Sequence, residues 1–325
     1  MNNKFIYIFL FFISFTLIFY SCKNISDCKP DSSLNFNEDS AYLYIAMQVK
    51  FGSRVPNSAA HDSCVILLSD KLKSFGADVV LQNADLERFD GIILHSTNII
   101  GTFYPDKKRR ILLFAHFDSR YYSDMEAEPE DQLNPVLGAN DGASGVGVLL
   151  EIARQISERE PDVGVDIVFF DAEDQGQPIY MDIFDEKAWC LGAQYWAENA
   201  KKDKYKALCG IGLDMVGTPN AIFAQDDNSR YFNNFLMKRF WKLADTLGYE
   251  NYFPKKFANS ILHDHVFVNQ IAGVPSVMIM DLRTDEEIPY FNNWHTHNDK
   301  LENIDKKSLK AIGQTLLNFV YCEKQ

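Results

Sequence analysis

Residues 164–176 read GVDIVFFDAEDQG, an apolar run that ends abruptly in acidic side chains. Asp171, Glu173 and Asp174 follow directly after a series of Val, Ile and Phe residues. A short continuous apolar run is typical of a strand that is covered on both faces of a sheet. The stretch therefore predicts a buried strand whose carboxyl end carries closely spaced carboxylates.

The rest of the chain repeats this pattern between helical segments. Further short apolar runs lie at 109–119, 208–217 and 273–281. Segments with helical spacing of apolar residues lie at 39–51, 60–75, 144–160, 190–202, 233–248 and 306–321. Segments 77–89 and 91–104 alternate in polarity and predict antiparallel strands. This succession predicts an α/β fold, a three-layer sandwich with a mixed, mostly parallel central sheet.

The composition is that of an ordinary globular domain. The chain has 325 residues, of which 46% are hydrophobic and 24% charged, and this is enough apolar material for one large core. No linker-like stretch divides residues 38–325, so we expect a single domain there. The formal net charge of −13 repels phosphate backbones, and nucleic acid is therefore not expected as a partner.

The N-terminus has the features of an export signal. Residues 1–21 combine a short basic start with an apolar run, and Cys22 follows a small residue. This predicts a lipoprotein signal peptide with lipidation at Cys22, and the alternative is an uncleaved membrane anchor. The polar residues 22–37 are expected to form a flexible tether. We expect an exported, membrane-anchored lipoprotein that resides in the periplasm.

The cysteines that follow Cys22 are odd in number. They are Cys28, Cys64, Cys190, Cys209 and Cys322. In an oxidising compartment an odd number requires at least one unpaired thiol or a link to another chain. The chain has no C-x-x-C pair, so a thiolate metal site is not expected, and single buried cysteines are the expectation for most of them.

Acidic and imidazole side chains follow several of the predicted buried strands. These residues are His116, Asp118, Asp171, Glu173, Asp174 and Asp214, with His295 and His297 after a longer loop and Asp141 in a glycine-rich turn before a helix. The carboxyl ends of parallel strands form the ligand-binding edge of an open α/β sheet. We therefore expect these side chains to converge at one edge.

Carboxylates and imidazoles together predict a zinc site. A catalytic zinc ion binds three protein groups and keeps one position open. A neighbouring carboxylate that does not bind the metal serves as general base, and the pair Glu173 and Asp174 fits this division. Each of these residues also has a simpler interpretation. Asp171 would then only form a turn, His116 would be a buried core histidine, and Glu173 and Asp174 would belong to a solvated loop.

A set of short motifs occurs in the order found in the glutaminyl-peptide cyclotransferases. The motifs are RVPNS (54–58), AHFDSRYY (115–122), GANDGASGV (138–146), IVFFDAEDQG (167–176), CLGAQYWA (190–197), GLDMVG (212–217), GVPSVMIM (273–280) and WHTHND (294–299). From about residue 51 to its end the chain resembles this family, which shares its fold with the co-catalytic zinc aminopeptidases. AHFDSRYY and the tryptophan before His295 favour the cyclotransferase branch.

The resemblance implies a zinc-exopeptidase-like fold and a role for each site residue. Asp141, Asp174 and His295 resemble the ligands of one zinc ion per chain, Glu173 the acid/base residue, Asp214 a second catalytic carboxylate, and Trp294 the aromatic wall of the substrate pocket. Two positions depart from the animal enzymes. Asp174 stands where they usually have Glu, and His263-Asp264-His265 replaces an acidic pair before the histidine. The roles of His263 and Asp264 stay open.

The activity implied by the resemblance is cyclisation of the N-terminal glutamine of peptides and proteins to pyroglutamate, with release of ammonia. The implied partners are such peptides, together with the membrane through the lipid anchor. The main alternative is an aminopeptidase that holds a second zinc ion with His116 and Asp214 and releases N-terminal amino acids. A non-catalytic peptide-binding lipoprotein is a third hypothesis, and the intact Glu173 argues against it.

Overall fold

The computed structural model describes residues 28–181, 184–284 and 290–324. The predicted signal segment 1–21 and the predicted lipidation site Cys22 lie outside these residues. Within the described ranges, no helix combines the length and the apolar character that crossing a membrane requires.

A six-stranded sheet with the order β1-β2-β4-β3-β5-β8 forms the centre of the molecule. Its strands are β1 (Asp78–Glu87), β2 (Ile93–Phe103), β3 (Arg110–His116), β4 (Gly164–Phe170), β5 (Gly210–Leu213) and β8 (Ser276–Ile279). β2 runs antiparallel to both β1 and β4, whereas β4, β3, β5 and β8 are parallel neighbours. The mixed, mostly parallel sheet predicted from the sequence is confirmed.

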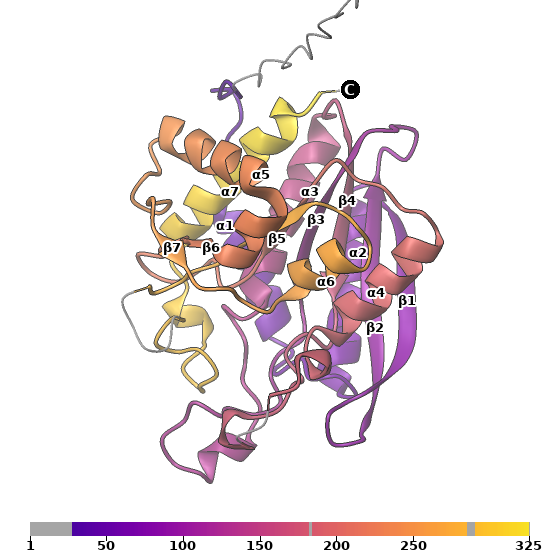
Figure 1. Cartoon of the computed structure of the whole chain (residues 1–325), viewed down its shortest axis with the longest axis vertical. Coiled ribbons are helices and arrows are strands. Elements are labelled where there is room, and N and C mark those ends of the chain that lie inside the picture. Colours follow the sequence, from indigo (N-terminus) through magenta and orange to yellow (C-terminus); the bar gives the residue numbers. More distant parts are fainter. Residues whose placement is uncertain (1–27, 182–183, 285–289, 325) are drawn as a thin grey trace, which may run out of the picture.

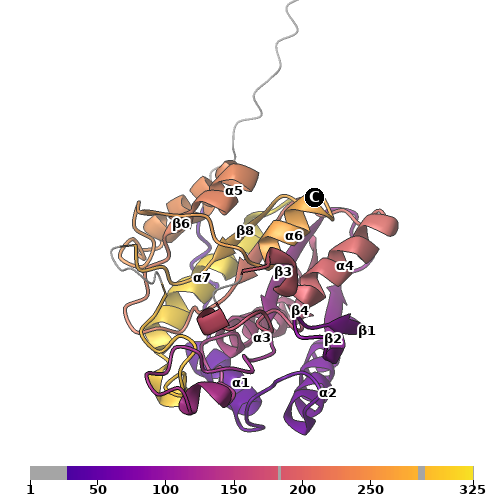
Figure 2. The same ribbon diagram turned by 60° about the horizontal axis from the view of Figure 1, so that its bottom comes forward.

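Helices cover both faces of this sheet and complete a three-layer sandwich, as Figures 1 and 2 show. One face carries α1 (Glu38–Val49), α2 (Ala59–Ser74), α3 (Ala143–Glu158) and α7 (Lys306–Cys322). The opposite face carries α4 (Leu191–Lys202) and α6 (Asp264–Gln270). The last long helix, α5 (Asp227–Thr246), packs against β8 and α7.

The side chains of β3 show why its sequence is continuously apolar. Ile111 and Leu113 point into the core beneath α3, and Leu112 and Phe114 point into the core beneath α4 and α6. Successive side chains of a strand point to opposite faces of a sheet. Because both faces are covered, a buried parallel strand favours apolar residues on both of its faces.

Several small elements were not predicted from the sequence. Helix α6 has 7 residues, and the pair β6 (Gln225–Asp226) and β7 (Phe257–Ala258) has two residues in each strand. Short 3-10 turns lie at Asp131–Leu133, Ile179–Met181, Glu186–Ala188 and Leu301–Asn303. Elements of this length are too short for the spacing of apolar residues to distinguish a helix from a strand.

The predicted tether 22–37 is wrong for its described part, residues 28–37. Phe36 is fully buried, and its backbone N–H donates to Gln314 Oε1 of α7 at 2.9 Å. Cys28 forms a disulfide with Cys322 at the end of α7, with a Cα–Cα distance of 5.4 Å. Figure 1 shows this start of the described chain beside the C-terminal end of α7. The segment was predicted as a tether because most of its residues are polar, although Phe36 packs into the core.

The remaining cysteines agree with the expectation of single buried thiols. Cys64, Cys190 and Cys209 are free and buried. The pairing of Cys28 with Cys322 was not predicted, because spacing along a chain does not determine which cysteines meet.

Candidate active site

The site lies at the carboxyl edge of the parallel strands. His116 is the last residue of β3, Asp171 follows β4, and Asp214 follows β5. Asp141 comes from the turn before α3, and His295 comes from the loop that leads to α7. The contacts confirm the predicted convergence for His116, Asp141, Asp214 and His295. Asp171 instead contacts His61 and Thr97.

Asp141, Asp174 and His295 form one buried group of ligand atoms. His295 Nε2 lies 3.2 Å from Asp174 Oδ1 and 3.7 Å from Asp141 Oδ2, and one ligand atom of each residue lies within 4.8 Å of the others. Asp174 Oδ2 is buried and has no hydrogen-bond partner among the described residues. A nitrogen and two carboxylate oxygens with an unsatisfied buried oxygen fit a zinc ion with one open position.

Two residues that the sequence analysis missed orient this group. Asp124 Oδ1 lies 3.0 Å from His295 Nδ1, within ion-pair distance but without hydrogen-bond geometry. Arg120 binds both oxygens of Asp124, at 2.9 and 2.6 Å, and donates to the backbone oxygen of Asp174 at 2.9 Å. A carboxylate on the far nitrogen of a histidine turns its other nitrogen toward a metal. Burial would raise the pKa of Asp124, but Arg120 and His295 outweigh burial and hold this pKa far below its usual range.

Asp141 is held by Asp299 of the WHTHND motif and by a close backbone approach. The backbone N–H groups of Asn140 and Asp141 donate to the two oxygens of Asp299 at 2.7 and 3.0 Å. A Cβ atom at Gly142 would lie 2.4 Å from His116 Nε2, so only glycine allows the His116 ring to reach Asp141. Burial, followed by Asp174 and Asp214, raises the pKa of Asp141 to about 6.

A second group of ligand atoms shares the Asp141 carboxylate. His116 Nε2 lies 3.0 Å from Asp141 Oδ1 and 3.2 Å from Asp214 Oδ1. The oxygens of Asp214 already have partners: Oδ1 accepts the Met215 backbone N–H at 2.7 Å, and Oδ2 lies 3.3 Å from His263 Nε2. Burial favours the neutral form of Asp214, but His116 and His263 lower its pKa well below the usual range.

His263, whose role stayed open in the sequence analysis, faces Asp214. Its Nδ1 accepts the Asp264 backbone N–H at 2.8 Å, which places the proton of the neutral ring on Nε2, toward Asp214. Burial lowers the pKa of His263, whereas Glu173 and Asp214 raise it to about 9. The acidic neighbours thus favour the protonated ring, and in both protonation states Nε2 carries a proton that it donates toward Asp214.

Glu173 lies beside both groups of ligand atoms. The residue is 7% exposed, and its Oε1 accepts a hydrogen bond from the Cys190 thiol with a sulfur–oxygen distance of 3.1 Å. Burial raises the pKa of Glu173 to about 8, although His263 and His116 oppose this shift. A carboxylate with a raised pKa is suited to exchanging protons near neutral pH.

Other residues singled out in the sequence lie outside the ligand groups. Asp171 accepts from His61 Nε2 at 2.8 Å and from the Thr97 backbone N–H at 2.7 Å, so its role is the structural one. Asp118 accepts the backbone N–H groups of Glu173 and Asp174 at 3.1 and 3.2 Å and thereby shapes their loop.

His297 and His265 likewise point away from the ligand groups. His297 Nε2 lies 2.9 Å from the Ser123 hydroxyl. His265 is fully buried in α6, with Nε2 3.6 Å from Asp226. Neither histidine belongs to any of the ligand groups found among the described residues.

The backbone is left-handed at several non-glycine residues of the site. Ala172, Cys190, Met215 and His295 have φ angles of 51°, 55°, 49° and 54°. Such conformations carry a cost for residues with a Cβ and persist where surrounding contacts fix them. Local helix and strand propensity therefore cannot account for the way the loops place Asp174, Asp214 and His295.

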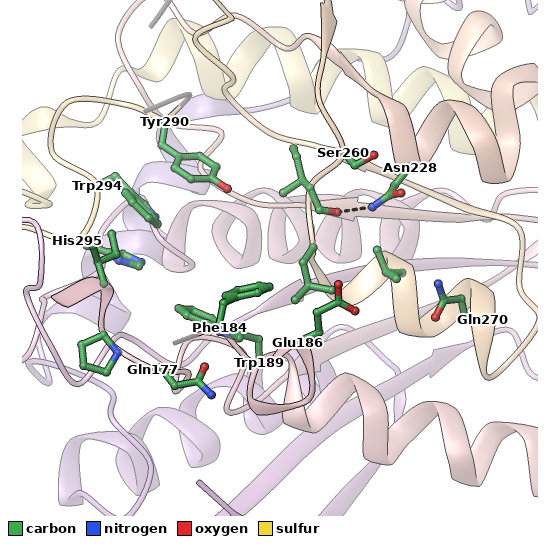
Figure 3. Close-up of a pocket in the computed structure, with 15 residues that line it drawn as sticks. Gln177, Phe184, Glu186, Trp189, Asn228, Ser260, Gln270, Tyr290, Trp294 and His295 are labelled. Atoms are coloured by element: carbon green, nitrogen blue, oxygen red, sulfur yellow. Dashed lines mark hydrogen bonds between the residues drawn. The ribbon is translucent and has the colours of Figure 1, made fainter. Parts of the chain in front are cut away.

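A deep cleft leads to the ligand groups. An inner cavity of about 60 Å³, lined by Asp141, Glu173, Asp174 and Asp214, adjoins a cleft of about 830 Å³. Trp294 lines both and stacks on His295, with a centroid distance of 3.7 Å. Figure 3 shows Trp294, His295 and Tyr290 at one end of this cleft, and Asn228, Ser260 and Gln270 at the other.

An α/β sandwich with carboxylates and imidazoles gathered at its strand ends defines the class of zinc-exopeptidase-like proteins. Peptidase family M28 matches residues 98–320. The chain belongs to this family.

Solved structures with high similarity extend over almost the whole chain. A glutaminyl cyclase from Bacteroides thetaiotaomicron is 45% identical, with a TM-score of 0.87 over 90% of this chain and 99% of that chain. The Tannerella forsythia glutaminyl cyclase is 46% identical, with a TM-score of 0.87 over 90% and 100%. A leucine aminopeptidase precursor from B. thetaiotaomicron is 44% identical, with a TM-score of 0.86 over 90% and 99%.

Curated relatives are more distant. The bovine glutaminyl-peptide cyclotransferase is 23% identical over 252 residues, which cover 69% of this chain and 65% of that protein. Aminopeptidase YwaD of Bacillus subtilis is 26% identical over 238 residues, which cover 70% of this chain and 44% of that protein. The chain thus spans 65% of the bovine protein and 44% of YwaD, which is less than two thirds of either relative.

Proposed function

We propose that this protein is a zinc-dependent glutaminyl-peptide cyclotransferase. It converts the N-terminal glutamine of peptides and proteins to pyroglutamate and releases ammonia. The observation that carries this proposal is the position of Glu173, a buried carboxylate with a raised pKa next to the ligand Asp174. The similarity to two bacterial glutaminyl cyclases across nearly their full length supports it.

Asp141, Asp174 and His295 would hold the zinc ion, and the ion when bound would supply a Lewis acid for the γ-carbonyl oxygen of the glutamine side chain. The chain itself supplies the binding and the proton transfers. The α-amine forms a bond to the side-chain carbonyl carbon, and the bond from that carbon to the amide nitrogen breaks. Because both groups belong to one residue, the reaction gains from proximity once the side chain is folded back.

Glu173 moves the proton in this scheme. It takes a proton from the attacking α-amine and delivers it to the departing nitrogen, which leaves as ammonia. A buried carboxylate with a pKa of about 8 is a stronger base than an ordinary glutamate once it is ionised. Its position in the wall of the inner cavity is compatible with both transfers.

Asp214 binds the leaving amide nitrogen in our proposal. It lines the inner cavity, and His116 and His263 keep it ionised, so it can accept an N–H of the amide. Trp294 and Tyr290 form an aromatic wall at the cavity mouth, with their rings 4.3 Å apart. This wall would pack against the compact ring that forms.

We further propose that the chain holds one zinc ion. The group of Asp141, Asp174 and His295 offers a buried carboxylate oxygen that has no hydrogen-bond partner in the described part of the chain. In the group of His116, Asp141 and Asp214, by contrast, His263 already contacts Asp214 Oδ2. A second ion bound by this group would draw charge from Asp214 and weaken that hydrogen bond, and hydrogen bonds to charged groups contribute about 1.5–3 kcal/mol.

Metal analysis tests this stoichiometry. We expect one tightly held zinc per chain in the wild type and tighter binding of a second ion in His263→Ala. Two tightly held zinc ions in the wild type would contradict both the proposed stoichiometry and the proposal that His263 disfavours a second ion.

An aminopeptidase is the second candidate, favoured by the intact group of His116, Asp141 and Asp214 and by the leucine aminopeptidase precursor among the similar structures. The two activities differ in their products. Ammonia release from glutamine-initiated peptides, abolished by a chelator and restored by zinc, supports the cyclotransferase. Release of free amino acids from unblocked peptides supports the aminopeptidase.

We also propose that the protein is an exported lipoprotein anchored at Cys22 in the periplasm. The disulfide between Cys28 and Cys322 supports an oxidising compartment. Metabolic labelling with a fatty acid should modify the wild type and leave Cys22→Ala unlabelled. Equal labelling of both proteins would show that the lipid is attached at another residue. Labelling of neither would show that the protein carries no lipid anchor.

A further inference from the structure

The first turn of α4 holds the loop that carries Glu173. Three successive backbone N–H groups, of Cys190, Leu191 and Gly192, donate to the carbonyl oxygens of Glu173, Ala172 and Asp171 at 2.8, 3.0 and 3.0 Å. A Cβ atom at Gly192 would lie 2.1 Å from the Asp171 oxygen. The helix and the loop therefore form one rigid unit.

Cys190 adds a side-chain contact to this unit. Its side chain is fully buried, and its Sγ lies 3.1 Å from Glu173 Oε1. Among the described residues, this thiol is the one recorded hydrogen-bond donor to the Glu173 carboxylate, and the nearest imidazole nitrogen, His263 Nε2, is 3.9 Å away. Cys190 also has a φ of 55°, so its position is fixed by its surroundings.

We propose that Cys190 is a positioning residue for Glu173, and that its thiol fixes one carboxylate oxygen so that the other is free for proton transfer. This inference rests on the proposed role of Glu173 as the base. Burial raises the pKa of the Cys190 thiol well above its usual range, so the thiol stays protonated and remains a donor.

Substitution of Cys190 separates positioning from packing. We expect Cys190→Ala to lower kcat about ten-fold to a hundred-fold, because misplacement of a catalytic group by about 1 Å can cost about a hundred-fold in rate. KM and the zinc content should stay at their wild-type values. Cys190→Ser keeps a hydrogen-bond donor and should retain kcat within about three-fold of the wild type.

Cys209 provides the matched control. Its thiol is also buried, but it lies in the core on the other face of the sheet. Cys209→Ala should therefore keep kcat, and its melting temperature shows the cost of removing a buried thiol alone. A Cys190→Ala protein with wild-type kcat overturns the proposal, as does a kcat loss in Cys190→Ser equal to that in Cys190→Ala.

The outcomes distinguish this inference from the proposed function. If the wild type releases no ammonia from glutamine-initiated peptides, the proposed function fails first. If the wild type is active and Cys190→Ala behaves as Cys209→Ala does, only the positioning role fails. Should Cys190→Ala not fold, Cys190→Ser still decides, because a kcat loss of ten-fold or more in that variant with its zinc retained contradicts the proposal.

Discussion

The Nε2 atom of His116 lies 3.0 Å from Oδ1 of Asp141. The other oxygen of this carboxylate faces His295, at 3.7 Å. Asp141 thus stands between two groups of potential metal ligands, and the number of ions that the site holds becomes the property that separates a cyclotransferase from an aminopeptidase.

Replacing Glu173 by glutamine should remove activity and leave the metal in place. The amide keeps the size of the side chain but cannot accept a proton, and general acid–base catalysis contributes about 10²–10⁴-fold. We expect ammonia release to fall by this order, while zinc content and melting temperature stay near the wild-type values. Near-normal turnover in Glu173→Gln would show that another residue is the base.

Replacing His295 by alanine should remove the metal, and replacing Asp124 by asparagine should weaken its binding. Loss of a group that orients a metal-binding histidine typically lowers affinity about 10–100-fold, and Asp124 lies 3.0 Å from His295 Nδ1. Zinc titration measures both effects. His297→Ala is the control, since His297 contacts Ser123 rather than the ligand group, and a loss of zinc in this variant would require a different ligand assignment.

Breaking the disulfide should destabilise the fold without changing the chemistry. Cys28 and Cys322 are 294 positions apart, so their bond constrains most of the unfolded chain, and a native disulfide typically contributes about 2–4 kcal/mol. We expect Cys28→Ser to lower the melting temperature and the free energy of unfolding, with kcat preserved at low temperature. An unchanged unfolding curve would show that Phe36 and the other contacts of the segment suffice.

Substrates with a basic residue after the glutamine should be favoured. Among the described residues, Glu186 is the one acidic side chain that lines the larger cleft, and no ion pair involves it there. We expect Gln-Lys peptides to have a several-fold higher kcat/KM than Gln-Glu peptides at low salt, because exposed charges interact weakly and are screened. Glu186→Gln should remove the difference, and a preference that survives in this variant would contradict the assignment.

The sequence was sufficient where a pattern is long or chemically distinctive. The continuous apolar runs of β3 and β4 predicted the parallel sheet, and the acids after β4 led us to expect that Asp174 would lie near His295, which it does at 3.2 Å. Asp124 and Arg120 were missed because they lie in an irregular loop, where spacing along the chain carries no information about contacts.

The contacts of Cys190 and His263 also depend on tertiary structure alone. Cys190 meets Glu173 only because α4 packs against the loop after β4. His263 reaches Asp214 from the cap of a helix of 7 residues, which is too short to be predicted from periodicity. The packed segment 28–37 was misjudged because its polar composition outweighed Phe36.

Product analysis of one reaction tests the central claim most directly. The zinc-loaded protein is incubated with glutaminyl-alanine, and ammonia and free amino acids are measured in the same mixture, with and without a chelator. We predict ammonia together with pyroglutamyl-alanine, no free alanine, and loss of both products on chelation. Free glutamine and alanine in place of ammonia would contradict the account and identify the protein as an aminopeptidase.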